Sequence, residues 1–434
     1  MCATTVQSGM DGVRVLLEDA IAQWHACDTS FPQATRRFSE HEQAPREAQL
    51  ARFLGSLEAE VKRLPRTRSD RDSVRERLTD AFVRFAKSGL GMEDRHLDLL
   101  LGGGFSGVGT ALARRARRFD PAVSAADILQ ACRNAWTACG LQVLLGRPMQ
   151  VTPSIFAYSM LYPYSDNYLD DPKVTREEKV SFSGRFGRRL EGDSIRPANA
   201  HEENIWRLIG LIEGQYPRRS YPQVYLSLLA IHRAQFDSLR LSRSGAATGE
   251  VDILRLGFAK GGTSVLADGY LAAGSLTAEE AHFIFLWGVV LQLGDDLQDV
   301  RDDHAGGILT LFSQAAGKEP LDAVTSRTFH FGERVMSLLE GVGVAESGTL
   351  KELMRRASRS FLLRCAGEVS EFYTPEYLAR LEACSPYRFS FLNRRREQFT
   401  HRQAAFTRLF EAFLAAGDDE PAFPLLPSGL MPRL

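Results

Sequence analysis

Residues 281–303 read AHFIFLWGVVLQLGDDLQDVRDD, and this stretch predicts one helix that is apolar in its first half and acidic in its second. Because the first half is apolar on all sides, we expect the helix to be buried. Four aspartates, which we call the second aspartate ladder, lie on one helical face or beside it: Asp295, Asp296, Asp299 and Asp303. Ionised carboxylates that continue from a buried helix are unfavourable unless they take up protons or bind a metal. The alternative is an exposed acidic helix end.

A second acidic stretch, YPYSDNYLDDP, covers residues 162–172. We call its three aspartates the first aspartate ladder: Asp166, Asp170 and Asp171. Pro172 ends the helix there, and the negative end of the helix dipole favours a cation at this place. Mg²⁺ usually binds through one or two carboxylates together with substrate phosphates. The two ladders therefore predict several Mg²⁺ ions, bound together with a diphosphate.

Basic side chains close to the ladders are candidates for contacting those phosphates. They are Arg176, Lys179 and Arg185 after the first ladder, Arg301 within the second, and Lys260 between the two. Lys260 lies on an otherwise apolar helix, in front of Gly261 and Gly262. Two glycines inside a helix indicate either a kink or the close approach of another backbone.

The composition and the hydrophobic pattern predict an all-α protein. The chain has 434 residues, of which 44% are hydrophobic, and this is enough for one large domain or two. A net charge of −1 argues against nucleic acid as a partner. The N-terminus lacks a targeting pattern, and no apolar stretch is long enough for an integral membrane segment. Six cysteines without metal-binding or redox spacing favour a reduced, cytoplasmic protein.

The composition and the hydrophobic pattern also predict that the chain is divided into three segments. Residues 1–90 are expected to form an N-terminal helical extension without recognisable chemistry. Residues 91–416, where the helices become more apolar, are expected to form the catalytic domain. Residues 417–434 are rich in proline and predict a flexible tail.

Two motifs resemble those of a known family. The stretch GVVLQLGDDLQD is similar to the second aspartate-rich motif of the trans-prenyl diphosphate synthases, FQxxDDxxD; it contains the glutamine as Gln292 and departs only at Leu291. The stretch YSDNYLDD resembles the first aspartate-rich motif of the class I isoprenoid synthase superfamily, in a DxxxDD form nearer to squalene and phytoene synthases. Lys260 and Thr263 stand where that family has a Lys-Thr pair before the second motif. The resemblance covers residues 99–316 and is expected to extend to about residue 415.

The resemblance implies an isoprenoid synthase-type helical bundle, in which the two ladders face each other across a central active-site cavity. Mg²⁺ ions bound by the ladders would hold a small-molecule prenyl diphosphate and draw off pyrophosphate, leaving an allylic carbocation. The resemblance is also compatible with a homodimer. The implied catalytic residues are Asp166, Asp170, Asp295 and Asp299, and the implied substrate-binding residues are Arg176, Lys179, Arg185, Lys260, Thr263, Gln292 and Arg301.

Within this superfamily the sequence favours a terpene synthase that uses one diphosphate. Chain-elongating synthases bind a second diphosphate through lysine and arginine, but the comparable stretch LLLGGGFSGVG has Phe105 and Ser106. Chain elongation and head-to-head condensation remain the alternative, since the DDxxD form of the second ladder is a prenyl synthase trait. A non-catalytic prenyl diphosphate-binding subunit is a further alternative. Two ExxH pairs would allow a di-iron site, but both lie where coincidence explains them.

Overall fold

The computed structural model describes residues 3–33, 36–102, 104–241, 252–400 and 403–414. Over these ranges the regular elements are α-helices and short 3₁₀ helices, with no strand, which confirms the all-α prediction. The predicted tail, residues 417–434, lies outside the described residues. Contacts divide the chain into two compact units.

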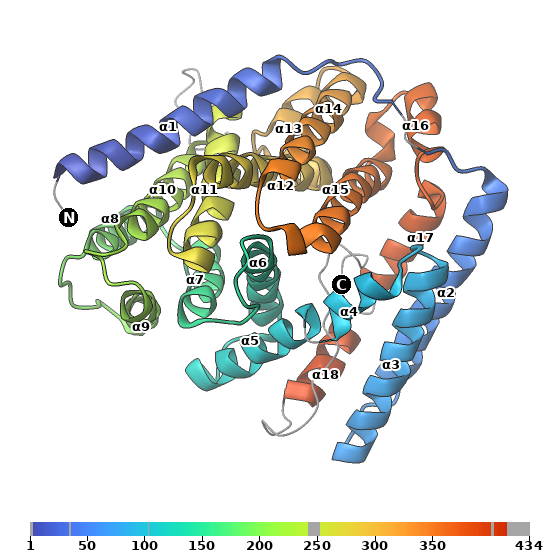
Figure 1. Cartoon of the computed structure of the whole chain (residues 1–434), viewed down its shortest axis with the longest axis horizontal. Helices are drawn as coiled ribbons and strands as arrows, with labels where there is room; N and C mark the ends of the chain where they lie inside the picture. Colours follow the sequence, from blue (N-terminus) through green and yellow to red (C-terminus); the bar gives the residue numbers. More distant parts are fainter. Residues whose placement is uncertain (1–2, 34–35, 103, 242–251, 401–402, 415–434) are drawn as a thin grey trace. The chain divides into compact units, whose positions relative to one another are not determined.

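Unit 1 comprises Met1–Pro32, Thr137–Ser347 and Glu371–Thr374. Its helices are α1 (Ala3–His25), α7 (Pro153–Asp170), α8 (Arg176–Glu191), α9 (Ala200–Gln215), α10 (Pro222–Ser238), α11 (Ile253–Ala273), α12 (Ala278–Gly306), α13 (Leu311–Ala316) and α14 (Asp322–Leu338), with the 3₁₀ helices η1 (Leu239–Leu241), η2 (Leu339–Gly341) and η3 (Ala345–Ser347). Both aspartate ladders belong to this unit. Helix α11 contacts α7, α10 and α12, and it therefore links the helices that carry the two ladders (Figure 1).

Helix α12 forms as the sequence predicts. Thr277 and Glu280 make a capping box at its start, in which each side chain accepts a hydrogen bond from the other residue's backbone. The apolar first half is fully buried from Phe283 to Leu286. The helix ends at Gly307, which has the left-handed φ of 70° that glycine allows.

Glycines allow α11 and α12 to approach each other closely. A Cβ atom on Gly288 of α12 would lie 2.3 Å from the carbonyl oxygen of Gly261, and one on Gly262 would lie 2.5 Å from the ring of Phe285. Helix α11 is unbroken through both of its glycines. Of the two readings of the glycine pair, close backbone approach is therefore the one that the structure shows.

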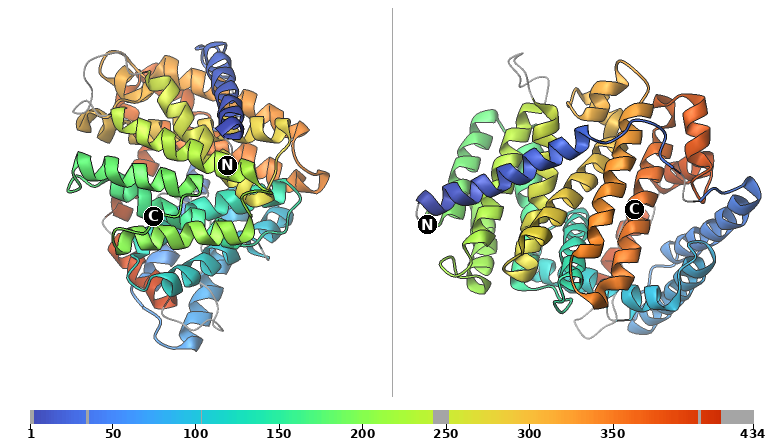
Figure 2. Two further views of the ribbon diagram at one scale, coloured as in Figure 1. Left: turned by 90° about the vertical axis from the view of Figure 1, so that its left-hand side faces the viewer. Right: turned by 45° about the horizontal axis from the view of Figure 1, so that its top comes forward.

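Helix α1 packs within unit 1 against α10, α11, α12 and α14, and the right-hand view of Figure 2 shows it crossing them. The buried ring of Trp24 meets Phe258 of α11 and Phe331 of α14 edge to face, with both centroid distances 5.8 Å. Glu18 accepts two hydrogen bonds from Arg255, at 2.7 and 3.0 Å. The predicted extension 1–90 is therefore divided between the two units. Periodicity shows that a helix has an apolar face, but it does not show which helix covers that face.

Unit 2 comprises Gln33–Trp136, Gly348–Ser370 and Pro375–Leu434. Its helices are α2 (Glu40–Val61), α3 (Arg68–Ser88), α4 (Asp94–Leu101), α5 (Phe105–Phe119), α15 (Gly348–Glu368), α16 (Pro375–Glu382), α17 (Phe389–Thr400) and α18 (Gln403–Leu414), while α6 (Ala125–Leu144) and η4 (Ser370–Phe372) belong in part to each unit. The buried Glu47 of α2 accepts hydrogen bonds from the backbone and the guanidinium of Arg388, at 2.8 and 3.0 Å. The boundaries of the two units divide the predicted segment 91–416 between them.

None of the helices in the described ranges has the length and the apolar character that crossing a membrane would require.

Candidate functional site

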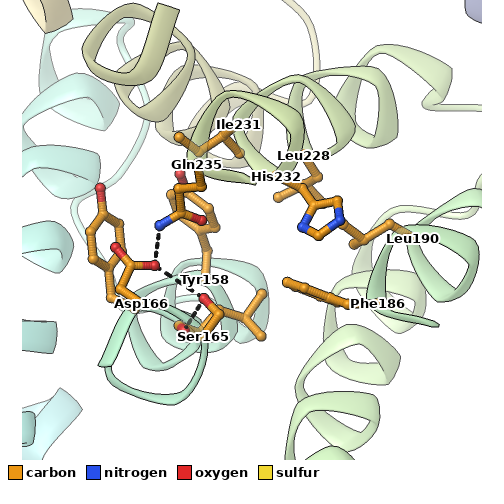
Figure 3. A pocket seen from close by; sticks show the side chains of 11 residues that line it. Tyr158, Ser165, Asp166, Phe186, Leu190, Leu228, Ile231, His232 and Gln235 are labelled. Carbon is orange, nitrogen blue, oxygen red and sulfur yellow. Dashed lines mark hydrogen bonds between the residues drawn. The ribbon is translucent and has the colours of Figure 1, made fainter. Parts of the chain in front are cut away.

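The first ladder meets α10 at Asp166. This half-buried carboxylate accepts a hydrogen bond from the side-chain amide of Gln235, and a second from the hydroxyl of Ser165 at 3.2 Å (Figure 3). An amide and a hydroxyl that donate to one carboxylate restrict its rotation. Asp166 is thereby held in one orientation at the C-terminal end of α7.

Two tyrosines join α7 to α11 next to Asp166. The hydroxyls of Tyr162 and Ser264 lie 2.6 Å apart, and Tyr158 donates to the carbonyl of Ser264 at 3.1 Å. Burial raises the pKa of the Tyr162 phenol, and the negative charges of Asp166 and Asp295 raise it further. Because these charges come from α7 and α12, one carboxylate of each ladder acts on the same side chain.

The second ladder is mostly half-buried. Only Asp295 is exposed among its four carboxylates. Burial raises the pKa of Asp296 to about 7, and the charges of Asp295 and Asp303 add to this rise. The pKa of Asp303 is likewise raised to about 7, first by burial and then by its acidic neighbours. Gln292 opposes the rise at Asp296, to which its amide donates at 2.7 Å. These carboxylates would gain stability from a cation.

Lys260 of α11 faces the second ladder. Its positive charge lowers the pKa of both Asp296 and Asp303 against the larger effect of burial. A Cβ atom on Gly257, one turn earlier, would lie 3.9 Å from a carboxylate oxygen of Asp296, so this face of α11 turns toward α12. Thr263 is buried, and its hydroxyl donates to the carbonyl four residues before it at 2.6 Å. The structure thus brings Lys260 to the ladder, whereas the Thr263 hydroxyl is used within its own helix.

The remaining carboxylates of the first ladder lie at the end of α7. The side chain of Asp170 lies outside the described residues. Asp171 caps the helix, and its carboxylate accepts a hydrogen bond from the backbone of Lys173 at 2.8 Å. The helix ends before Pro172, as the sequence predicts.

The predicted basic contacts divide into two groups. Arg176 is exposed and Lys179 half-exposed in the first turn of α8. Arg185 instead makes two hydrogen bonds to the buried Glu202, at 2.9 and 2.8 Å. Arg301 donates to Glu371 at 2.6 Å. Arg185 and Arg301 therefore already have carboxylate partners, which residue spacing could not reveal.

The ladder carboxylates fit the predicted metal only together with a phosphate ligand. Among the described side chains, no three histidine, cysteine or acidic residues are grouped so that they could hold an ion by themselves. Carboxylates on separate helices still fit Mg²⁺ that is bound jointly with phosphates, because such ions take only one or two protein carboxylates. The raised pKa values of Asp296 and Asp303 fit a place where a cation is expected.

Two hollows share His232, and the smaller one is lined by Asp166. A cavity of about 20 Å³ has room for about one water molecule. Its lining includes Tyr158, Tyr162, Asp166, Phe186, His232 and Gln235 (Figure 3). A groove of about 480 Å³, a size typical of ligand sites, runs between α8 and α10. The cavity at Asp166 is smaller than a prenyl group, and the predicted central cavity stays a prediction.

Sequence reasoning missed Gln235 and His232. Both lie in the helix segment YLSLLAIHRAQF, which is otherwise mostly apolar, and they are three residues apart. This spacing puts them on one helical face. Polar residues on the buried face of an apolar helix are the signal that could have identified them.

Comparisons of the chain with protein-family models, with curated proteins and with solved structures found no match.

Proposed function

We propose that the chain is a Mg²⁺-dependent class I terpene synthase with an isoprenoid synthase-type helical bundle. It ionises an allylic prenyl diphosphate and cyclises the carbocation, with release of pyrophosphate. One observation carries the proposal: α11 packs against both α7 and α12, which carry the two ladders, and carboxylates of both ladders raise the pKa of the Tyr162 phenol. Motifs far apart in the sequence that converge in this way are expected of one site that holds metal and diphosphate.

The ladder carboxylates would hold the ions. Asp166 on α7 and Asp295 on α12 are the best placed, with Asp299 and Asp303 on the same face of α12. When bound, Mg²⁺ neutralises the charge that develops on the departing pyrophosphate. Lys260 adds a protein cation beside Asp296 and Asp303. Gln235 and Gln292 orient Asp166 and Asp296.

The apolar part of the substrate would lie toward the aromatic side chains. Tyr158 and Phe186 line the cavity at Asp166, and their ring faces can stabilise a cation. Because this cavity is small, the side chains around it must move when the substrate binds. Closure around the substrate would then exclude the water that quenches a carbocation.

A prenyl diphosphate synthase is the second candidate, favoured by the DDxxD spacing from Asp295 to Asp299. It would need a second diphosphate site. At the position where such enzymes carry basic residues, Phe105 is buried, and the hydroxyl of Ser106 donates to the carbonyl of Leu101 at 3.4 Å. These neutral side chains favour the terpene synthase.

Pyrophosphate release from each allylic diphosphate supplied alone tests the proposal. With Mg²⁺, we expect release from at least one of geranyl, farnesyl and geranylgeranyl diphosphate, together with hydrocarbon products detected by gas chromatography. Asp295→Asn should reduce release by at least about a hundredfold, as expected for the loss of a charged contact to the transition state. Glu279→Gln is the matched control, because Glu279 is exposed in the first turn of α12, at the other end of the helix from the ladder. Release that requires isopentenyl diphosphate would instead show chain elongation, and no release under either condition would refute both candidates.

A further inference from the structure

His232 of α10 lines both the cavity at Asp166 and the α8–α10 groove. Its side chain is only 7% exposed. The ring of Phe186 meets the imidazole edge to face at 4.8 Å, and a Cβ atom on Gly187 would lie 3.2 Å from its Nε2 atom. The imidazole is therefore fixed in its place by close packing.

The hydrogen bonds of His232 identify its tautomer. Nε2 lies 3.0 Å from the backbone carbonyl oxygen of Ser183. A carbonyl can only accept, so Nε2 carries the proton and donates it. Burial and the nearby Arg233 cation lower the pKa of His232 to about 4, so the ring is neutral near pH 7. Nδ1 therefore bears a lone pair.

Within the described part of the chain, no group donates a hydrogen bond to this lone pair. A buried acceptor without a partner destabilises the fold, and such an atom calls for an explanation. The hydrogen bond to Ser183 accounts for Nε2 but leaves Nδ1 without a partner among the described residues. A basic nitrogen at a cavity wall indicates a role toward whatever enters the cavity.

The position of His232 relative to the first ladder suggests what its partner is. Gln235 lies about one turn further along α10, on the same face, and holds Asp166 (Figure 3). A diphosphate bound at Asp166 would direct the attached hydrocarbon along this face, toward His232 and Leu228. The reacting carbon atoms would then lie beside the imidazole.

We propose that His232 is the base that ends the reaction, with its Nδ1 atom removing a proton from the carbon next to the cationic centre. The C–H bond breaks, its electron pair forms the carbon–carbon double bond, and the proton forms the new N–H bond. The imidazolium later passes the proton to the departing pyrophosphate or to solvent. A weak base is sufficient here, because a carbocation is a strong acid at the adjacent C–H bond. This inference rests on the proposed terpene synthase activity.

Two substitutions test the role of His232. His232→Phe and His232→Gln both remove the basic nitrogen, and Gln223→Ala at the exposed start of α10 is the control. Pyrophosphate release and the hydrocarbon products are measured in the same reactions. We expect both variants to keep releasing pyrophosphate while the main olefin falls at least tenfold relative to pyrophosphate, replaced by alcohols or by olefins deprotonated elsewhere. The glutamine variant carries the test if the phenylalanine variant does not fold.

The outcomes separate the two proposals. If the wild type releases pyrophosphate and both His232 variants keep its ratio of olefin to pyrophosphate, the role of His232 is refuted and the proposed function stands. If the wild type releases none, both proposals fall. Nitrogen-15 NMR of the free protein adds an independent reading: a neutral ring protonated at Nε2 near pH 7 supports the inference, and an imidazolium or an Nδ1–H tautomer overturns it.

Discussion

The close approach of α11 and α12 predicts that Gly288→Ala destabilises the protein. The added Cβ atom would lie 2.3 Å from the carbonyl oxygen of Gly261, and a backbone atom cannot rotate away. The two helices must separate instead, and overpacking of this kind costs about 1–3 kcal/mol. Alanine also gains roughly 1 kcal/mol over glycine from helix propensity, which offsets part of that loss. The contact also holds Lys260 against the second ladder, so catalysis should fall as well.

A second glycine isolates the packing effect. Gly210 lies inside α9, and a Cβ atom there would have no neighbour within 4 Å. Gly210→Ala should therefore be stabilising by up to about 1 kcal/mol. The difference in free energy of unfolding between the two alanine variants, measured by urea denaturation, should be about 1–3 kcal/mol. Equal stability of the two variants would refute the close contact between α11 and α12.

Three further predictions concern the second ladder and α1. Without Mg²⁺, Asp296→Asn should gain stability relative to wild type as the pH rises from about 4 to about 7, because the folded wild type holds the proton of Asp296 up to a pKa of about 7, whereas the unfolded chain releases it near 3.8. The comparison with the variant separates this contribution from that of His232, whose lowered pKa acts in the opposite direction. A difference in melting temperature that does not change with pH would contradict this prediction. Trp24→Ala should lower the free energy of unfolding by about 3–5 kcal/mol, because it removes the ring that packs on Phe258 and Phe331; a loss below about 1 kcal/mol in urea denaturation would mean that α1 is peripheral. Lys260→Ala should weaken Mg²⁺-dependent pyrophosphate binding about tenfold in calorimetry, with partial rescue by Lys260→Arg, and unchanged affinity would assign the lysine a structural role.

The sequence predicted the features that depend on local physics. The apolar first half of α12, its capping box and the end of α7 before Pro172 all follow from neighbouring residues. The grouping of Asp295, Asp299 and Asp303 on one face follows from helical periodicity alone. The glycine pair in α11 indicated two possibilities, and only the partner helix could decide between them.

Tertiary pairing accounts for what the sequence did not predict. Arg185 pairs with Glu202 of the following helix, and the packing of α1 depends on apolar faces of helices more than 200 residues away. The roles of Gln235 and His232 depend on their hydrogen bonds to Asp166 and Ser183, which belong to other helices. Residue spacing predicts which residues share a face of one helix. It does not predict the contacts between two helices.

Calorimetric binding of pyrophosphate tests the central claim, that both ladders serve one site, most directly. The titration compares wild type, Asp166→Asn, Asp295→Asn and the control Glu279→Gln in the presence of Mg²⁺. We predict that the Asp166 and Asp295 variants each bind pyrophosphate at least about tenfold more weakly, a loss of about 1.4 kcal/mol or more, and that the control binds as wild type does. Wild-type affinity in either ladder variant would contradict the claim.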